Sequence, residues 1–155
     1  YLIDTLSILK NQGLAFKHLI LGEGTQRDVL TKKIQSLNLE DHISLAGSVD
    51  QPINLIKEAD ILILSSEFEG FGLVIVEALA AGTTVVSTDC QSGPAEILSN
   101  GLYGYLGPID DSKKFSEAIN FGYFNKIPSN KLIARSKDFS IKNVGPKYLQ
   151  LIDEI

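Results

Sequence analysis

Residues 59–89 read ADILILSSEFEGFGLVIVEALAAGTTVVSTD and contain the signals of a strand, a turn, a helix and a second strand in that order. The unbroken apolar run at 61–64 is typical of a central parallel strand covered on both faces. A helix is expected from about Phe71 to Ala81, because Gly82 supplies a stop signal. The segment TTVVS at 83–87 predicts the next strand. This stretch therefore predicts a βαβ unit with parallel strands.

The same alternation continues on both sides of this unit. Before it, the pattern predicts a helix up to Asn11, a strand at 16–21, a helix from a Thr25–Asp28 capping box to about Ser36, a strand at 42–45 and a short helix from Pro52 to about Ala59. After it, the expected elements are a helical turn at 95–98, a strand at 103–106 and, past an Asp110–Asp111 helix cap, only helices. The fold class is α/β, a Rossmann-like doubly wound parallel sheet whose ligands sit beyond the carboxyl ends of the strands. The loops at 22–24, 47–49, 65–73 and 89–96 are therefore expected to build the site.

Composition limits the functions that the chain can have. Its 155 residues are 44% hydrophobic and 21% charged, which predicts one soluble globular domain with a substantial core. The formal net charge of -5 argues against a nucleic-acid partner, because such proteins need a basic face. A single cysteine, Cys90, and the absence of a long apolar run favour a cytoplasmic location. Neither His18 nor His42 stands in a metal-ligand pattern, so no metal is expected.

Two carboxylates carry the chemical signal of the central stretch. Glu69 lies in the loop after the apolar strand, and Glu77 lies eight residues later in an otherwise apolar helix. A carboxylate on the apolar stripe of that helix is costly unless it is bonded, and the two hydroxyls of a ribose are suitable partners. Glu69, just ahead of the glycines, is placed to accept hydrogen bonds from a sugar. A structural role, such as capping or a salt bridge for Glu77, stays open for each residue taken alone.

The turn between the two carboxylates can bind phosphate without basic residues. Gly70 and Gly72 allow a ligand to approach the backbone closely, and the helix N-terminus presents unpaired N–H groups. Ribose, diphosphate and sugar together describe a nucleotide sugar, although the glycines are equally typical of a tight turn. Gly22 and Gly24 form a second glycine turn that is either a ligand loop or an ordinary turn, because Arg27 stands where a dinucleotide motif needs a third glycine.

Taken in order and spacing, the segments LGEG, SLAGSV, the central stretch, GPAEIL and GYLG resemble the C-terminal domain of glycosyltransferase family 4 over about residues 1–125. The resemblance implies the GT-B fold, in which two Rossmann-like domains face each other and the second holds the sugar nucleotide. It implies that Glu77 holds the ribose and that Glu69, the candidate catalytic residue, holds the donor sugar. It further assigns the sugar and distal phosphate to the amides of Phe71, Gly72, Leu73 and Val74, and the base to the neighbourhood of Ser48 and Val49.

The function that this resemblance implies is transfer of a hexose or N-acetylhexosamine from a nucleotide diphosphate sugar to a glycan or lipid-linked acceptor, with retention of configuration, as in bacterial polysaccharide biosynthesis. No cofactor is expected, because the nucleotide diphosphate sugar is itself a substrate. The alternative is a nucleotide-binding or sensing module without catalysis.

Parts of such an enzyme are expected to lie outside these 155 residues. The family carries an arginine and a lysine just before the first helix, and the acceptor is bound by an N-terminal domain, so we expect the chain alone to be inactive. Residues 1–125 are interpreted as the nucleotide-sugar domain, truncated at its N-terminal side, and 126–155 as helices that pack on it or lead away. Six basic residues and one acidic residue between Lys126 and Lys147 predict either peripheral contact with anionic lipid at the inner face of the cell membrane or a solvated helical face.

Overall fold

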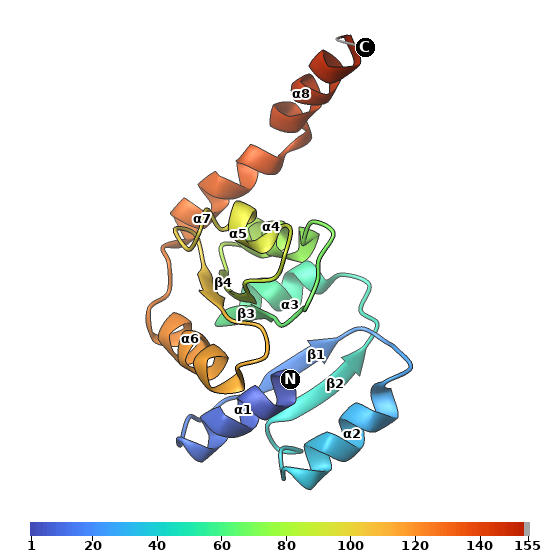
Figure 1. Ribbon diagram of the computed structural model, residues 1–155, viewed down its shortest axis with the longest axis vertical. Coiled ribbons are helices and arrows are strands. Elements are labelled where there is room, and N and C mark those ends of the chain that lie inside the picture. Colours follow the sequence, from blue (N-terminus) through green and yellow to red (C-terminus); the bar gives the residue numbers. More distant parts are fainter. Residues whose placement is uncertain (154–155) are drawn as a thin grey trace.

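The computed structural model describes residues 1–153, in which strands and helices alternate along the chain (Figure 1). The elements are α1 (Leu2–Asn11), β1 (His18–Leu21), α2 (Arg27–Ser36), β2 (Ile43–Gly47), α3 (Pro52–Glu58), β3 (Ile61–Leu64), α4 (Leu73–Ala81), β4 (Thr84–Thr88), α5 (Pro94–Ile97), β5 (Tyr105–Gly107), α6 (Ser112–Phe124), α7 (Ser129–Ser136), the short 3₁₀ helix η1 (Lys137–Phe139) and α8 (Ile141–Asp153).

All of the strand pairs within these sheets are parallel, which confirms the predicted α/β class. The strands form two groups, one with the order β1-β2 and one with the order β3-β4-β5. The prediction of a single sheet therefore needs one correction, because β1 and β3 do not pair with each other. A cleft separates them, and the side chains of β3 are only partly buried for that reason.

Helices cover both faces of the strands and form two apolar cores. One core joins α1, α2 and α6, with Leu6, Ile34 and Phe115 among its buried residues. The other joins α3, α4, α5 and α7. The neighbouring residues Val85 and Val86 of β4 point into opposite cores, as side chains of a strand alternate. β4 is buried along its whole length and is the central strand of its group.

The ends of the helices show which local signals operate. Gly82 ends α4 in the left-handed conformation (φ 78°), and the Asp111 carboxylate accepts a 3.0 Å hydrogen bond from the Lys114 N–H, so both predicted caps are confirmed. The predicted Thr25 capping box is wrong. No side chain caps α2, and its first N–H, that of Arg27, bonds to the backbone carbonyl of Gly24 instead (3.2 Å).

The C-terminal helices differ in how they relate to the rest of the molecule. α7 packs against α4, and its Leu132 is fully buried in the second core. α8 extends away from the body (Figure 1) and exposes Ile141, Tyr148 and Leu149. The domain boundary at residue 125 stays a prediction. No helix within residues 1–153 has the length and apolar character needed to cross a membrane.

Candidate functional site

The loops that follow the strands contact each other in two pairs. Beyond β1 and β2, the Gly22 N–H donates to the Gly47 carbonyl (2.7 Å). Beyond β3 and β4, Phe68 forms a backbone bridge with Gln91, and the Thr88 hydroxyl donates to the Ser66 carbonyl (2.5 Å). Each of the four loops predicted to build the site therefore contacts another at the carboxyl edge of the strands.

The cleft between β1 and β3 connects the two pairs of loops. It has a volume of about 1350 Å³. Its carboxyl end brings together four of the predicted site residues, which are Gly22, Ser48, Val49 and Val74, with Ser65 and Ser66. Gly24 is exposed and does not line this cleft, so the two glycines of that loop are placed differently.

Glu69 is held in one orientation by the loop that carries it. The Ser66 hydroxyl donates a 2.6 Å hydrogen bond to its Oε1, and Thr88 fixes the Ser66 backbone. Burial, and after it the charge of Glu69, raises the pKa of the Cys90 thiol. The Glu69 carboxylate is only partly buried and can accept further hydrogen bonds from a ligand.

The N-terminus of α4 presents free donors beside Glu69. Gly72 takes a positive φ of 89°, which a residue with a side chain would adopt only with strain, and α4 begins after it at Leu73. The first bond of the turn runs from the Ile75 N–H to the Gly72 carbonyl (2.9 Å). Within the described residues the N–H groups of Leu73 and Val74 have no recorded partner. Such a helix end is suited to an anion.

A second glycine, in the loop before α5, packs closely against this turn. Gly93 has a φ of 98°, and a Cβ atom there would lie 2.0 Å from the Phe71 carbonyl oxygen. Phe71 itself is 37% exposed. At Gly70, by contrast, a Cβ atom would meet no atom within 4 Å, so open space rather than packing lies on that side of the glycine.

Glu77 corrects part of the sequence argument. Its side chain is exposed, and no described residue forms a recorded hydrogen bond or ion pair with it. Because the Glu77 carboxylate is exposed, it needs no partner to offset the cost of burying a charge. The sequence argument had expected such a partner. Leu73 lies on the same stripe and is 67% exposed, so this part of α4 faces solvent. Assignment of Glu77 to a ribose stays a prediction.

Arg27 is a basic residue near this edge. The sequence analysis considered it only because it stands where a dinucleotide-binding motif would have its third glycine. Its guanidinium forms a 2.9 Å ion pair with Glu23 and donates to the Leu45 carbonyl (3.1 Å). Gly47 lies beside this pair with a φ of 75°, a left-handed conformation that favours glycine. The spacing of four residues between Glu23 and Arg27 was the available signal.

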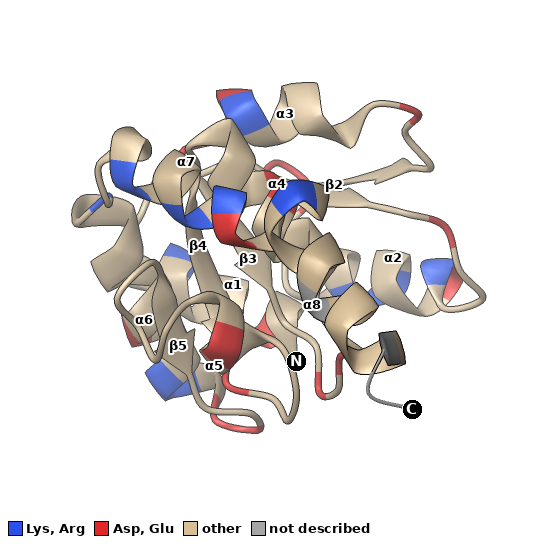
Figure 2. Cartoon of the chain, turned by 90° about the horizontal axis from the view of Figure 1, so that it is seen from above, with Lys and Arg blue, Asp and Glu red and all other residues tan. Residues whose placement is uncertain are grey.

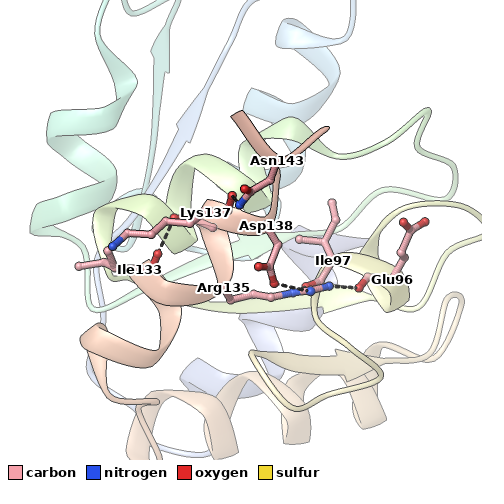
Figure 3. Close-up of polar contacts among 8 residues, drawn as sticks. Glu96, Ile97, Ile133, Arg135, Lys137, Asp138 and Asn143 are labelled. Atoms are coloured by element: carbon pink, nitrogen blue, oxygen red, sulfur yellow. Dashed lines mark hydrogen bonds and ion pairs between the residues drawn. The ribbon is translucent and has the colours of Figure 1, made fainter. Parts of the chain in front are cut away.

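Arg135 on α7 connects the C-terminal helices to the site (Figure 3). Its guanidinium donates to the carbonyls of Ile97 (2.9 Å) and Glu96 (2.7 Å), which close α5, and pairs with Asp138 (2.9 Å). It also lies 4.7 Å from the ring centre of Phe139. That ring contacts Phe71 edge to face, with 5.8 Å between the ring centroids. Sequence reasoning missed this network, since Arg135 lies 38 and 39 residues from Ile97 and Glu96, and Phe139 lies 68 residues from Phe71.

Fewer basic side chains of segment 126–147 are available to an anionic partner than its composition indicated. Lys126 pairs with Asp60, and Arg135 is used in the network just described. The remaining lysines of the segment lie on α7, η1 and α8, and Figure 2 shows the basic positions of the whole chain spread over several helices. This arrangement favours the solvated helical face over a lipid-binding patch.

Comparison with known proteins was made on sequence and on structure. The family model described as glycosyl transferases group 1 matches residues 1–139. An N-acetylgalactosamine-N,N'-diacetylbacillosaminyl-diphospho-undecaprenol 4-alpha-N-acetylgalactosaminyltransferase of Campylobacter jejuni is 32% identical over 127 residues, which is 79% of this chain and 35% of that protein. The chain thus spans about a third of the length of this relative.

Two solved structures share the fold. The crystal structure of TarM superposes with a TM-score of 0.87 at 25% identity, covering 97% of this chain and 31% of TarM. Anabaena Alr3699/HepE, solved in complex with UDP and glucose, superposes with a TM-score of 0.84 at 22% identity, covering 99% of this chain and 44% of its own.

Proposed function

The chain belongs to the group 1 glycosyl transferases, and from this premise we propose that it forms the donor-binding domain of a GT-B enzyme of glycosyltransferase family 4. The full-length protein then transfers a hexose or N-acetylhexosamine from a nucleotide diphosphate sugar to a glycan or lipid-linked acceptor, with retention of configuration. The acceptor is bound by a part of the protein outside these 155 residues.

The observation that carries the proposal is the pairing of an oriented carboxylate with a free helix N-terminus. Glu69 is held by Ser66 at 2.6 Å, and the amides of Leu73 and Val74 lie four and five residues further along the same turn. A diphosphate on those amides would leave its attached sugar beside Glu69. The HepE complex with UDP and glucose, and the sugar-transferring activity in the name of the Campylobacter relative, support a ligand of this class.

In this proposal the residues of the chain act mainly by electrostatics. The amides of residues 71–74 stabilise the charge that develops on the leaving diphosphate. Glu69 accepts hydrogen bonds from hydroxyls of the donor sugar and fixes the position of its reacting carbon. Glu77, which is exposed one turn into α4, accepts from the ribose hydroxyls. Gly22, Ser48 and Val49 contact the nucleoside from the other side of the cleft. No metal is assigned a role.

A nucleotide-binding module without catalysis is the competing function. Such a module has no use for a second carboxylate directed at a sugar, yet Glu69 is oriented by a hydrogen bond from Ser66 whose backbone is itself held by Thr88. This arrangement favours the transferase. We further propose a cytoplasmic location. The exposed Lys131 of α7 and Lys142 of α8 are the candidates for any peripheral contact with anionic lipid.

The test is transfer by the longer natural protein that contains this chain. It would be incubated with a panel of UDP and GDP sugars and a lipid-linked or glycan acceptor, and the anomeric configuration of the product read by NMR. Glu69→Ala should lower kcat/KM while inhibition by the free nucleoside diphosphate stays nearly unchanged. Inversion of configuration would exclude the family 4 assignment. Binding of nucleotides without transfer to any acceptor would favour the module.

A further inference from the structure

The turn that carries the candidate phosphate donors contains one side chain between two glycines. Phe71 stands between Gly70 and Gly72 in the sequence. Gly72 takes a positive φ of 89°, and a Cβ atom at Gly70 would meet no atom within 4 Å. Glycine adopts more backbone conformations than other residues, so neither glycine fixes the turn by itself. The Phe71 side chain is therefore the group of the three through which the rest of the protein can orient this turn.

The backbone of this turn packs against the beginning of α5. A Cβ atom on Gly93 would lie 2.0 Å from the Phe71 carbonyl oxygen, and one on Gly72 would lie 3.8 Å from the Cδ1 atom of Ile97. Gly93 and Ile97 belong to one helical turn, because the Ile97 N–H donates to the Gly93 carbonyl (2.8 Å). Ile97 is fully buried. One side of the turn is therefore in contact with α5 and with the residue that precedes it.

The ring of Phe71 contacts a residue from the C-terminal part of the chain. It meets the ring of Phe139, in η1, edge to face, with 5.8 Å between the centroids and 66° between the ring planes. Within residues 1–153 this is the one contact that Phe71 makes with another aromatic ring. Aromatic pairs of this kind prefer a defined geometry and stabilise beyond the area that they bury. Phe139 therefore limits the positions that the Phe71 ring can take.

Phe139 is itself held by Arg135. The guanidinium of Arg135 lies 4.7 Å from the centre of the Phe139 ring, within the range of cation–π attraction. The same guanidinium donates to the carbonyls of Ile97 (2.9 Å) and Glu96 (2.7 Å) at the end of α5 (Figure 3). One side chain of α7 thus contacts both neighbours of the turn, which are α5 on the side of its backbone and Phe139 on the side of its ring.

We propose that Phe139 is a positioning residue for the donor diphosphate. By holding the Phe71 ring, it keeps the N–H groups of residues 71–74 in the orientation that binds the phosphate nearest the sugar. It acts through Phe71 and not by contact with the ligand. Donors that are oriented before the ligand binds spare the entropic cost of ordering the turn on binding. The inference rests on the proposed function for the identity of the ligand.

The competing interpretation is that Phe139 only fills space beside the second core, against which it packs. Replacement of such a residue changes the stability of the protein, but it does not change how strongly the folded molecules bind one phosphate relative to another. A nucleoside monophosphate lacks the phosphate that the amides of residues 71–74 would bind. The two interpretations therefore differ in the ratio of the affinities for a nucleoside diphosphate and for its monophosphate.

The test is isothermal titration of the longer natural protein with UDP, GDP and the matching monophosphates. Phe139→Leu removes the ring and keeps an apolar side chain. We expect it to weaken binding of the nucleoside diphosphate about fivefold to tenfold, and to change binding of the monophosphate by less than about twofold, because one aromatic pair and part of the preorganisation are lost. Phe139→Tyr keeps the ring and should bind both ligands as the unsubstituted protein does.

Two further variants separate positioning from stability. Leu132→Val is the matched control, because Leu132 is fully buried in the same core on α7 and lies outside the ring pair. It should lower the melting temperature without changing the ratio of the two affinities. Phe71→Leu removes the same ring contact at a position that is 37% exposed, so it tests the contact even where Phe139→Leu does not fold. The double variant should bind the diphosphate within about twofold of either single variant, because both substitutions remove one contact.

Each outcome has one meaning. Unchanged diphosphate affinity in Phe139→Leu, an equal loss for the monophosphate, or the same change of ratio in Leu132→Val would overturn the inference and leave the proposed function standing. Additive losses in the double variant would show that the two rings act independently, which also overturns it. If the unsubstituted protein bound neither UDP nor GDP, the proposed function would fall and this inference with it. Selective loss of diphosphate binding, with full recovery in Phe139→Tyr, supports it.

Discussion

At the scale of single residues, the candidate site depends on positions where one atom decides the geometry. Ser66 orients Glu69 through one hydroxyl, and Gly93 allows the Phe71 carbonyl to approach because it has no Cβ. Glu77 differs from both, since its exposed carboxylate is free to meet a ligand without any rearrangement of the protein.

Glu77→Gln tests the ribose assignment. The substitution should weaken binding of a nucleoside diphosphate by about 1.5 kcal/mol, or about tenfold, because a charge-assisted hydrogen bond becomes a neutral one. Isothermal titration of the longer protein measures it. Glu117→Gln on α6, also exposed, is the matched control and should bind normally. If the unsubstituted protein bound the nucleoside diphosphate and its 2',3'-dideoxy analogue with equal affinity, the assignment would be contradicted.

Gly93→Ala tests the support behind the α4 turn. The new Cβ would lie 2.0 Å from the Phe71 oxygen at a φ of 98°, so the loop must shift, and we expect a loss of about 2 to 4 kcal/mol in the free energy of unfolding. Gly24→Ala, where no atom lies within 4 Å and φ is not positive, should change it by less than about 0.5 kcal/mol. Urea denaturation compares the two, and equal losses would refute the steric argument.

His18 makes stability depend on pH in a defined range. Burial lowers its pKa from 6.5 to about 4, so as the pH falls below 6.5 the unfolded chain takes up the proton before the folded one does. The contribution of His18 to stability should therefore decline between pH 6.5 and pH 4 and level off below. Urea denaturation across this range should show a flatter profile for His18→Gln. An unchanged profile would exclude His18 as the cause.

At the scale of elements, the site is positioned by packing between α4, α5 and α7. α4 supplies the free amides, and the loop before α5 backs the Phe71 turn. α7 contributes contacts to both of these elements. Its Arg135 donates hydrogen bonds to carbonyls at the end of α5, and Phe139, which follows α7, contacts Phe71. The C-terminal helices therefore belong to the architecture of the site, although they contribute no candidate ligand contact.

Arg135→Ala tests this connection. Loss of two carbonyl partners and one ion pair from a side chain that is 18% exposed should lower the free energy of unfolding by about 2 to 4 kcal/mol. Arg135→Lys should restore little, because an ammonium does not reproduce the planar set of donors. Lys131→Ala on the exposed side of α7 is the control and should be near neutral. Full recovery with lysine would show that charge alone matters.

At the scale of the whole molecule, the 155 residues hold one side of a proposed active site. The candidate donor contacts lie on the carboxyl edge of two strand groups, and the two relatives named above are about two to three times as long as this chain. In the proposed function, the acceptor site and the basic groups near the departing diphosphate belong to the rest of the full-length protein, while this chain supplies the amides of residues 71–74.

The 155-residue chain by itself should bind a nucleoside diphosphate weakly and transfer no sugar. Positioning of the acceptor contributes several kcal/mol to such a reaction, and each lost donor to the leaving group costs on the order of a hundredfold. The measurement is incubation with radiolabelled nucleotide sugars and acceptors beside the longer protein. Turnover within tenfold of the longer protein would contradict the assignment of these groups.

The sequence by itself was sufficient for the order and type of the elements. The apolar run at 61–64, the strand signal at 83–87, the stop at Gly82 and the cap at Asp111 are local signals, and local signals act through neighbouring residues. The sequence also placed the four site loops at one edge, since parallel strands bring their carboxyl ends together. The Thr25 capping box failed because a backbone turn from Gly24 already satisfies the first N–H group of α2.

Only the tertiary structure decided which groups are buried and which lie side by side. Exposure of Glu77, the hydrogen bond of Ser66 to Glu69, the contact of Gly93 with Phe71 and the reach of Arg135 across 38 residues to Ile97 all depend on how separate elements pack. The cleft between β1 and β3 belongs here as well. Helical and strand periodicity describe one element at a time, whereas burial and pairing are set by the neighbours that the fold brings to it.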